Sequence, residues 1–281
     1  MNVKILIDSA SDINAEEAQK LGVELVPIEV RFGTEQYLDG VTLLPAQFYD
    51  KLIESAELPK TSQINSFTFE ERFASLVGQG YEVVAITLSS KLSGTYRSAV
   101  TAAKKFNGKV FVVDSLNASI GERLLCRYAL QLADEGVEAR QIAQKLDEVK
   151  KKINLIALLD TLLYLKKGGR ISAVTAFAGQ MLSIKPVVGV IGGEVKLIGK
   201  AVGSKKGNNL LNELVGKKGI DFTMPYGAIY SGTDESKLNK YIRDSEAIWK
   251  GKVESVPVHA LGCTVGTHIG PGAIGVAFFE K

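Results

Sequence analysis

Residues 81–98, YEVVAITLSSKLSGTYRS, decide the fold class of this chain. Residues 81–88 are an apolar run rich in β-branched side chains, which is typical of a strand buried on both faces. A polar loop with one glycine follows, and the spacing of residues 95–106 then predicts a helix. A buried strand, a short polar loop and a helix in this order indicate a parallel sheet with helices packed on its faces.

The same order recurs on both sides of this stretch. Apolar runs at residues 3–7 and 109–113 predict two more buried strands. The carboxyl ends of parallel strands form the ligand crevice of such sheets, so we expect the polar loops that follow them to lie close together. These loops begin at Asp8-Ser9, Ser89-Ser90 and Asp114-Ser115.

The pattern changes near Asn154. Gly192-Gly193 joins two candidate strands, residues 186–191 and 194–198, and a two-glycine turn predicts an antiparallel hairpin. We therefore predict an α/β protein, with a three-layer parallel-sheet domain over residues 1–153 and an α/β domain with a mixed or antiparallel sheet over residues 154–281. The other expected elements are strands at residues 23–30 (irregular at Pro27), 226–230, 253–257 and 273–279, and helices at residues 15–22, 45–55, 67–77, 119–135, 139–152, 204–215 and 234–250.

The composition narrows the function classes. Hydrophobic residues make up 46% and charged residues 23% of the chain, which excludes a disordered protein. A net charge of +3 is too small to predict nucleic-acid binding, and two histidines without ligand-like spacing predict no metal site. No apolar run reaches the ~18 residues of a membrane span and no signal peptide is recognisable, so we expect a cytoplasmic protein without stable membrane insertion. Cys126 and Cys263 are then expected to be reduced thiols.

Ser93-Gly94-Thr95 lies where an anion could bind. Free backbone N–H groups and the helix dipole favour negative charge at the start of a helix, and Gly94 lets a ligand approach the backbone. An ordinary helix cap with a tight turn would have the same sequence, so both interpretations stay open.

Three other polar stretches allow the same two interpretations. Thr61 and Ser62 lie in a polar loop whose hydroxyl groups would suit a carboxylate, or would serve as plain loop and cap chemistry. Arg170 follows a two-glycine turn and is either solvated or an anion ligand. His268 lies in GTHIGPG, which we interpret as a glycine-rich loop, and is either structural or a ligand.

The acidic loop DSASD, residues 8–12, contains two carboxylates. Such a pair could suggest metal or phosphoryl chemistry, but no third acidic residue follows at EF-hand spacing. We interpret the stretch as a crevice loop in which Asp12 or Asn14 caps a helix.

Two further hypotheses about function stay open. A hydrolase or phosphotransferase could use Ser93 as nucleophile and His268 as base. Against it, Ser93 is not in a G-x-S-x-G elbow and no P-loop motif is present. The chain could also be a regulatory or interaction module for a protein partner.

Taken together, the motifs resemble the DegV family of bacterial fatty-acid-binding proteins over the whole chain. Their specificity comes from many separate parts in one fixed order. The parts are Asp8-Ser9-Ala10-Ser11-Asp12, Asp39-Gly40, Thr61-Ser62-Gln63, Leu92-Ser93-Gly94-Thr95-Tyr96, Val113-Asp114-Ser115, Leu165 through Ser172, Lys185-Pro186 and His268-x-Gly-Pro-Gly.

The resemblance implies a non-enzymatic protein that encloses a long-chain fatty acid such as palmitate between two domains, without another cofactor. It implies that Thr61, Ser93, Gly94 and His268 bind the carboxylate, with Arg170 nearby, and Ser62 is expected beside the head group. Family members present the acid to a separate fatty acid kinase, which makes acyl-phosphate for phospholipid synthesis.

This sequence departs from the family pattern at two places. Ile64 stands where proline usually follows TSQ, and Val202 stands where an arginine is usual, which puts docking of the usual kinase in doubt. The acyl tunnel needs apolar walls, which ordinary core residues resemble. The tunnel candidates are Leu158, Leu159, Leu162, Ile171, Val174, Phe177, Met181, Leu182, Ile184 and Val188.

Overall fold

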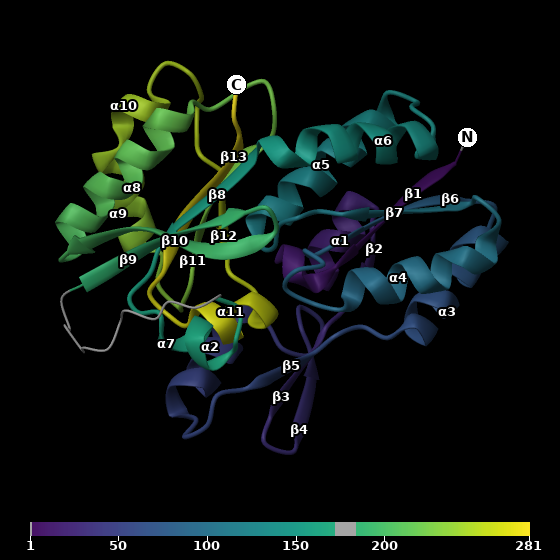
Figure 1. The fold of residues 1–281 in the computed structure, drawn as a ribbon, viewed down its shortest axis with the longest axis horizontal. Helices are drawn as coiled ribbons and strands as arrows, with labels where there is room; N and C mark the ends of the chain where they lie inside the picture. The colour runs from purple at the N-terminus through teal and green to yellow at the C-terminus, as the bar shows by residue number, and fades with distance from the viewer. Residues whose placement is uncertain (1, 172–183) are drawn as a thin grey trace.

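The N-terminal half is built in three layers on a parallel sheet (Figure 1). The computed structural model describes residues 2–171 and 184–281, and in this part of the chain the sheet has four strands in the order β2-β1-β6-β7, with every pair parallel. The predicted parallel sheet is confirmed. Its elements are β1 (Val3–Asp8), α1 (Ala15–Leu21), β2 (Glu24–Val26), α3 (Ser66–Gly78), β6 (Glu82–Thr87), α4 (Thr95–Ala103), β7 (Val110–Asp114), α5 (Ile120–Asp134) and α6 (Ala139–Val149).

Side chains of the central strands alternate between the two helix layers. Ile5 and Ile7 of β1 belong to the hydrophobic cluster formed with α5 and α6, whereas Leu6 belongs to the cluster formed with α3 and α4. Both faces of the sheet are therefore buried. This explains why the strands have continuous apolar runs instead of an alternating pattern.

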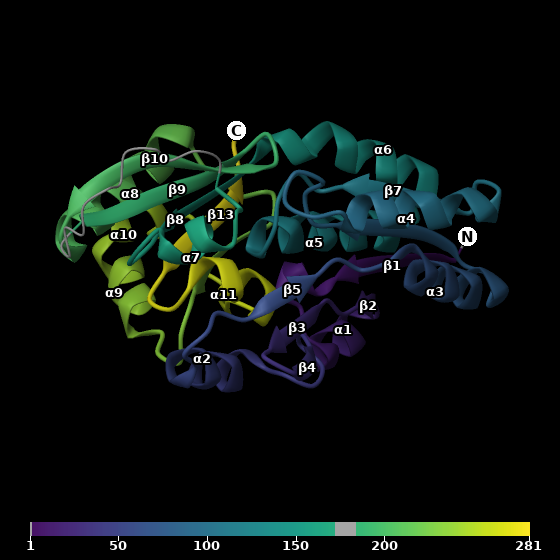
Figure 2. The same cartoon turned by 60° about the horizontal axis from the view of Figure 1, so that its bottom comes forward.

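A small antiparallel sheet of order β4-β3-β5, which the sequence did not predict, lies beside this half with helix α2 (Figure 2). Pro27 divides the strand expected at residues 23–30, as its lack of a backbone N–H suggested, so that β2 pairs with β1 and β3 pairs with β4 and β5. Strands of three or four residues are too short to give a periodic signal. The elements are β3 (Glu29–Phe32), β4 (Glu35–Leu38), α2 (Pro45–Glu54) and β5 (Lys60–Ser62).

The C-terminal half contains a mixed sheet, as predicted. In the described residues this sheet has six strands in the order β10-β9-β8-β13-β11-β12, antiparallel except for the β11–β12 pair. The Gly192-Gly193 turn joins β9 to β10, and both glycines have positive φ. The elements are β8 (Ile153–Leu158), α7 (Leu163–Lys167), β9 (Ile184–Ile191), β10 (Glu194–Val202), α8 (Ser204–Lys218), β11 (Tyr226–Tyr230), α9 (Ser236–Asp244), α10 (Glu246–Trp249), β12 (Val258–Ala260), α11 (Cys263–Ile269) and β13 (Ile274–Phe279).

Two expected elements of this half were wrong in their bounds. The helix expected at residues 234–250 is divided into α9 and α10 at Ser245, whose buried hydroxyl donates to Tyr241 O and accepts from Trp249 Nε1. The strand expected at residues 253–257 is instead β12, which pairs with β11 from Val258 onward.

Helix α5 connects the two halves. The hydrophobic cluster on its surface contains Ile7 and Val113 from the parallel sheet, and also Ile229 and Phe279 from the mixed sheet. Ile153, where the first predicted domain was expected to end, belongs to this same cluster. The division into domains at residue 153 therefore stays a prediction.

Candidate functional site

A cavity of about 340 Å³ lies between the two halves. This volume is within the range of small-molecule pockets, roughly 300–1,000 Å³. The walls come from the strand ends and loops of the N-terminal half, from β8 and β9, and from helix α11. They are formed by Ile28, Thr61, Ser62, Gln63, Leu88, Leu92, Ser93, Gly94, Ala118, Ser119, Leu155, Ala157, Leu165, Arg170, Val188, Gly189, Val190, Val195, Ile229, Tyr230, Ser231, Leu261, Thr264, Val265, His268, Ile269, Ala273 and Ile274.

Small residues in the mixed sheet explain why this space is not filled. Val188, Ala157, Gly275 and Ile229 are paired in one row across β9, β8, β13 and β11. A Cβ at Gly275 would lie 3.1 Å from Ala157 Cβ and 3.3 Å from Ile229 Cγ2, so it would point to the same face as these side chains. Because the two central residues carry at most a methyl group, the middle of the row forms a trough below its ends.

Helix α11 forms another wall. Thr264, Val265, His268 and Ile269 all line the cavity, and their spacing places them on one face of the helix. The interpretation of this stretch as a glycine-rich loop was wrong for His268, which lies in the last turn of α11. The three glycines of this stretch and the lack of a local cap favour a loop, so the sequence carries no sufficient signal for this wall.

Thr61 and His268 meet at the polar end of the cavity. Their side chains are 207 residues apart in sequence, yet Thr61 Oγ1 lies 3.2 Å from His268 Nε2. Thr61 is in the short strand β5, which is held by pairing with Val30 of β3. The small, unpredicted sheet therefore places this hydroxyl.

Ser93 and Gly94 lie at the start of α4, as the sequence predicted. Gly94 is the N-cap residue, and Ser93 Oγ accepts from Thr95 N at 3.2 Å and lies 3.0 Å from Thr95 Oγ1. A Cβ at Gly94 would lie 1.9 Å from Gln63 Oε1. The residue after Thr61 and Ser62 in the chain thus packs directly over Gly94, and this contact brings the two motifs together.

His268 is electrically neutral at pH 7. Burial, and secondarily the nearby Arg170 guanidinium, lower the pKa of His268 to about 4. Nδ1 is buried and has no hydrogen-bond partner among the residues that the structure describes. A buried N–H without an acceptor is rare, which favours the tautomer with the proton on Nε2. In that tautomer His268 donates to Thr61 Oγ1, and the Thr61 hydroxyl can donate into the cavity.

Arg170 reaches the same end of the cavity from the turn after α7. Its Nη1 donates to Gly168 O at 2.6 Å and its Nε donates to Leu92 O at 3.3 Å. The guanidinium thus links this turn to the loop that carries Ser93. Thr61, Ser62, Ser93, Gly94, Arg170 and His268, all identified in the sequence, line one cavity.

The tunnel candidates have different positions. Val188 lines the cavity, and Leu159, Leu162 and Ile171 pack in a hydrophobic cluster with it. Ile184 is half-buried at the start of β9. Val174, Phe177, Met181 and Leu182 lie outside the described residues.

Leu158 has to be removed from the tunnel candidates. It packs in the cluster beneath α8, where a Cβ at Gly207 would lie 2.9 Å from both of its methyl groups. Successive side chains of a strand point to opposite faces, so Ala157 faces the cavity and Leu158 faces the helices. Ala157 and Leu155 are lining residues that the sequence interpretation missed.

The described contacts do not assemble the nucleophile and base of a hydrolase. His268 Nε2 contacts Thr61, whereas Ser93 Oγ contacts Thr95, and His268 Nδ1 has no carboxylate partner in this part of the structure. Within residues 2–171 and 184–281, no group of three His, Cys, Asp or Glu side chains could hold a metal ion. Among the helices described, none is long and apolar enough to cross a membrane.

Comparison with known proteins agrees with this architecture. A DegV domain-containing protein of Caldanaerobacter subterraneus is 33% identical over 283 residues, covering 99% of each chain. The structure of a fatty-acid-binding DegV family protein from Thermus thermophilus covers 100% of each chain with a TM-score of 0.89 and 31% identity. A stearic-acid-binding protein from Eubacterium ventriosum has a TM-score of 0.84 and 28% identity, covering 99% of this chain and 98% of its own.

The family assignment follows from the extent of these matches. The model of the family described as "Uncharacterised protein, DegV family" matches residues 2–281. The relatives above match over nearly their full lengths as well. This chain belongs to the DegV family.

Proposed function

We propose that this protein binds one long-chain fatty acid in the cavity between its two halves. The observation that carries the proposal is that one cavity brings Thr61, Ser93 and His268 together with walls of the mixed sheet and α11 that are mostly apolar. The fatty-acid-binding relatives from Thermus thermophilus and Eubacterium ventriosum support it, because they share the whole fold.

The carboxylate is held by neutral donors in this proposal. A buried carboxylate without hydrogen bonds would be very costly. The Thr61 hydroxyl, the Ser93 hydroxyl and the backbone at Gly94 lie at the start of α4 or next to it, and hydrogen bonds to a charged group contribute roughly 1.5–3 kcal/mol each. Arg170 and Ser62 complete the rim of the polar end. These donors offset most of the desolvation cost.

The acyl chain supplies the favourable free energy. Palmitate buries roughly fifteen carbons at ~0.8 kcal/mol each, a gross gain of about 12 kcal/mol. Association costs roughly 4–15 kcal/mol, so the hydrocarbon gives useful affinity only when the head group is not a net loss. Val188, Ala157, Val195 and Ile269 provide apolar surface for the chain.

The bound acid is presented to a separate fatty acid kinase for phospholipid synthesis, and the protein itself is not the enzyme. This part of the proposal rests on the family resemblance. Val202, which replaces the usual arginine, is 58% exposed at the end of β10. A kinase partner would therefore meet an apolar side chain there. We also infer a cytoplasmic location, which the same resemblance supports.

Native mass spectrometry tests the binding proposal. Protein purified from bacteria should carry a mass excess equal to one fatty acid, and delipidated protein should regain it from palmitate or oleate. Protein that stays empty after incubation with both acids would contradict the proposal. Conversion of palmitate and ATP to acyl-phosphate should require an added kinase, and turnover by this protein alone would show that it is an enzyme.

A further inference from the structure

Two acidic residues of the N-terminal half hold the first turn of helix α11. Asp39 Oδ1 accepts from Cys263 N at 3.0 Å, and Asp39 Oδ2 accepts from Thr264 N at 2.9 Å. Asp12 Oδ1 accepts from Gly262 N at 2.8 Å. Three consecutive backbone N–H groups of the C-terminal half are therefore bound by carboxylates more than 200 positions away in the sequence.

Helix α11 has no side-chain cap of its own. Its N-cap residue is Gly262, which has no side chain to accept the free N–H groups of the first turn. The absent side chain also makes room, because a Cβ at Gly262 would lie 2.9 Å from Asp12 Oδ1 and 3.5 Å from Asp39 Oδ1. The position is thus shaped for carboxyl oxygens from outside the helix, which accept the free N–H groups of its first turn.

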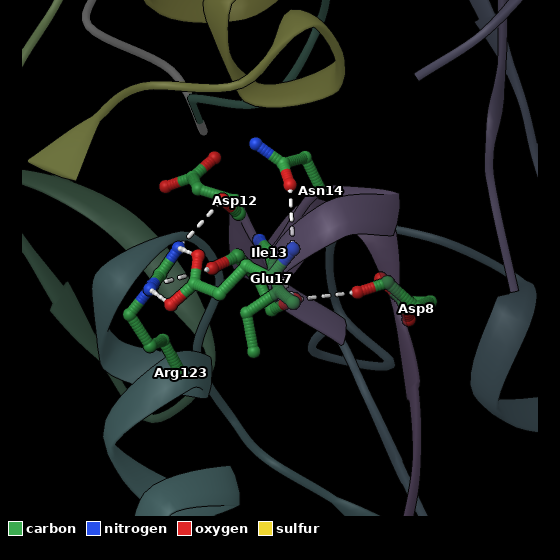
Figure 3. A network of polar contacts seen from close by, with 7 residues as sticks. Asp8, Asp12, Ile13, Asn14, Glu17 and Arg123 are labelled. Carbon is green, nitrogen blue, oxygen red and sulfur yellow. Dashed lines mark hydrogen bonds and ion pairs between the residues drawn. The ribbon is translucent and has the colours of Figure 1, made fainter. Parts of the chain in front are cut away.

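Both carboxylates are held firmly. Asp39 is 2% exposed. The backbone of Asp12 is fixed by Arg123 of α5, whose Nη2 donates to Asp12 O at 2.6 Å while the guanidinium pairs with Glu17 (Figure 3). Asp12 Oδ2 also accepts from Ser119 Oγ, which comes from the residue preceding α5. The Asp12 side chain therefore cannot turn away from α11 without also breaking its hydrogen bond with Ser119.

The helix held in this way carries the histidine of the candidate site. Cys263 and His268 are the first and sixth of the seven residues in α11, so about 7.5 Å of helix separates the bound first turn from the ring. A helix this short has little stability of its own, so its position depends on the groups bound to its ends. Displacing its first turn would displace His268 and the contact with Thr61.

We propose that Asp39, supported by Asp12, is a positioning residue that sets the location of the His268 ring at the polar end of the cavity. The inference deepens the fatty-acid proposal, since the head group is what His268 is expected to meet. The DSASD and Asp39-Gly40 motifs thereby acquire a role in ligand binding, although neither carboxylate contacts the ligand.

The first experiment observes the ring without any ligand. Histidine side-chain ¹H–¹⁵N spectra would be recorded for the wild-type protein, Asp39→Asn, Asp12→Asn and the control Asp50→Asn, which changes an exposed aspartate of α2. The His268 signal is assigned from its loss in His268→Gln. We expect Asp39→Asn to move the His268 ring signals and raise the pKa of His268, and Asp50→Asn to change neither. Unchanged signals in both Asp39→Asn and Asp12→Asn would overturn the inference.

The second experiment is a double-mutant cycle for oleate affinity. Asp39→Asn should weaken binding about tenfold, or about 1.4 kcal/mol, in the wild-type background. It should weaken binding less than about twofold in His268→Gln, because its effect passes through the ring. Equal weakening in both backgrounds would show a general structural role and overturn the inference. A wild-type protein that binds no fatty acid would defeat the proposed function, while the ring spectra would still decide the positioning role.

Discussion

Gly168 packs directly against the ring of His268, so closely that a Cβ on Gly168 would lie 2.2 Å from Nδ1. A second contact of the same kind joins Gly270 to Tyr164, because a Cβ on Gly270 would lie 2.2 Å from the Tyr164 ring. The His268 ring of α11 thus packs on Gly168, the C-cap residue of α7. The Tyr164 ring of α7 packs on Gly270, the C-cap residue of α11. These paired contacts hold the C-terminal end of α11 as the carboxylates hold its first turn.

Gly168→Ala should displace His268 and weaken fatty-acid binding about tenfold. Gly168 has φ −76°, which any residue can adopt, so the effect would come from the added methyl group alone. We expect a loss of roughly 1–3 kcal/mol in the free energy of unfolding from overpacking, measured by urea titration. Gly216→Ala in α8 is the control, since a Cβ there meets nothing within 4 Å and should stabilise the helix by about 0.5–1 kcal/mol. Gly168→Ala with wild-type affinity would contradict the role of this contact.

Ala157→Leu should abolish fatty-acid binding while leaving a folded protein. The larger side chain would fill the trough between Val188 and Ile229, which faces the cavity. Binding is measured by calorimetry with delipidated protein, and folding by circular dichroism.

The neighbouring substitution Leu158→Ala is the matched comparison. Leu158 is 6% exposed on the opposite face, so its truncation should lower the free energy of unfolding by roughly 2–5 kcal/mol. The cavity should stay open, and the folded variant should bind palmitate. If the two variants exchanged these phenotypes, the assignment of the strand faces would be incorrect.

Thr61→Val should weaken fatty-acid binding by removing the hydroxyl at almost constant volume. A hydrogen bond to a charged group contributes roughly 1.5–3 kcal/mol, which corresponds to about a tenfold to 150-fold change in Kd. Thr61→Ser keeps the hydroxyl and should retain most of the affinity. Equal affinity of the valine and serine variants would exclude this hydroxyl as a carboxylate donor.

His268 should titrate near pH 4 in the ligand-free protein, as followed by NMR of the ring. Its pKa is lowered on folding, so the unfolded chain takes up the proton first as the pH falls from about 6.5 toward 4. The contribution of His268 to the free energy of unfolding is therefore fully present above pH 6.5 and is lost as the pH falls from 6.5 to 4. This contribution amounts to at most about 3 kcal/mol.

The comparison of wild type with His268→Gln isolates this contribution, since buried Asp8 and Asp12, whose pKa values burial raises to about 7, affect both proteins alike. The stability difference between the two should shrink as the pH is lowered from 6.5 to 4. Bound fatty acid should raise the pKa of His268, because a carboxylate stabilises the protonated ring. A ring that titrates at its ordinary value with and without ligand would contradict the buried position.

The parallel sheet could be predicted because its strands are continuous apolar runs that end in polar loops. The residues of the candidate site could be identified for a different reason, namely the ordered motifs of the family. Asp12 or Asn14 was expected from local sequence to cap a helix, and Asn14 Oδ1 does accept from Glu17 N at the start of α1. Apolar runs and helix caps depend on residues that are close together in the chain, so they can be recognised in the sequence.

Helix α11 could not be predicted from its own residues. GCTVGTHIG contains three glycines and no residue that caps its first turn, which indicates a loop. The helix exists because Asp39 caps it and because Gly266 lies against Tyr49, where a Cβ would be 2.8 Å from the hydroxyl. Both partners belong to segments that are distant in sequence.

The sequence by itself determined the class of the two larger sheets, the hairpin at Gly192-Gly193 and six of the residues that line the cavity. The tertiary structure alone decided that Ala157 and not Leu158 faces the cavity, that His268 contacts Thr61, and that Asp39 holds the helix carrying that histidine. The physical reason is that alternation along a strand specifies two faces without naming the inner one. A cap or contact that comes from a segment 200 residues away, in turn, produces no periodic pattern in the sequence of the helix that it stabilises.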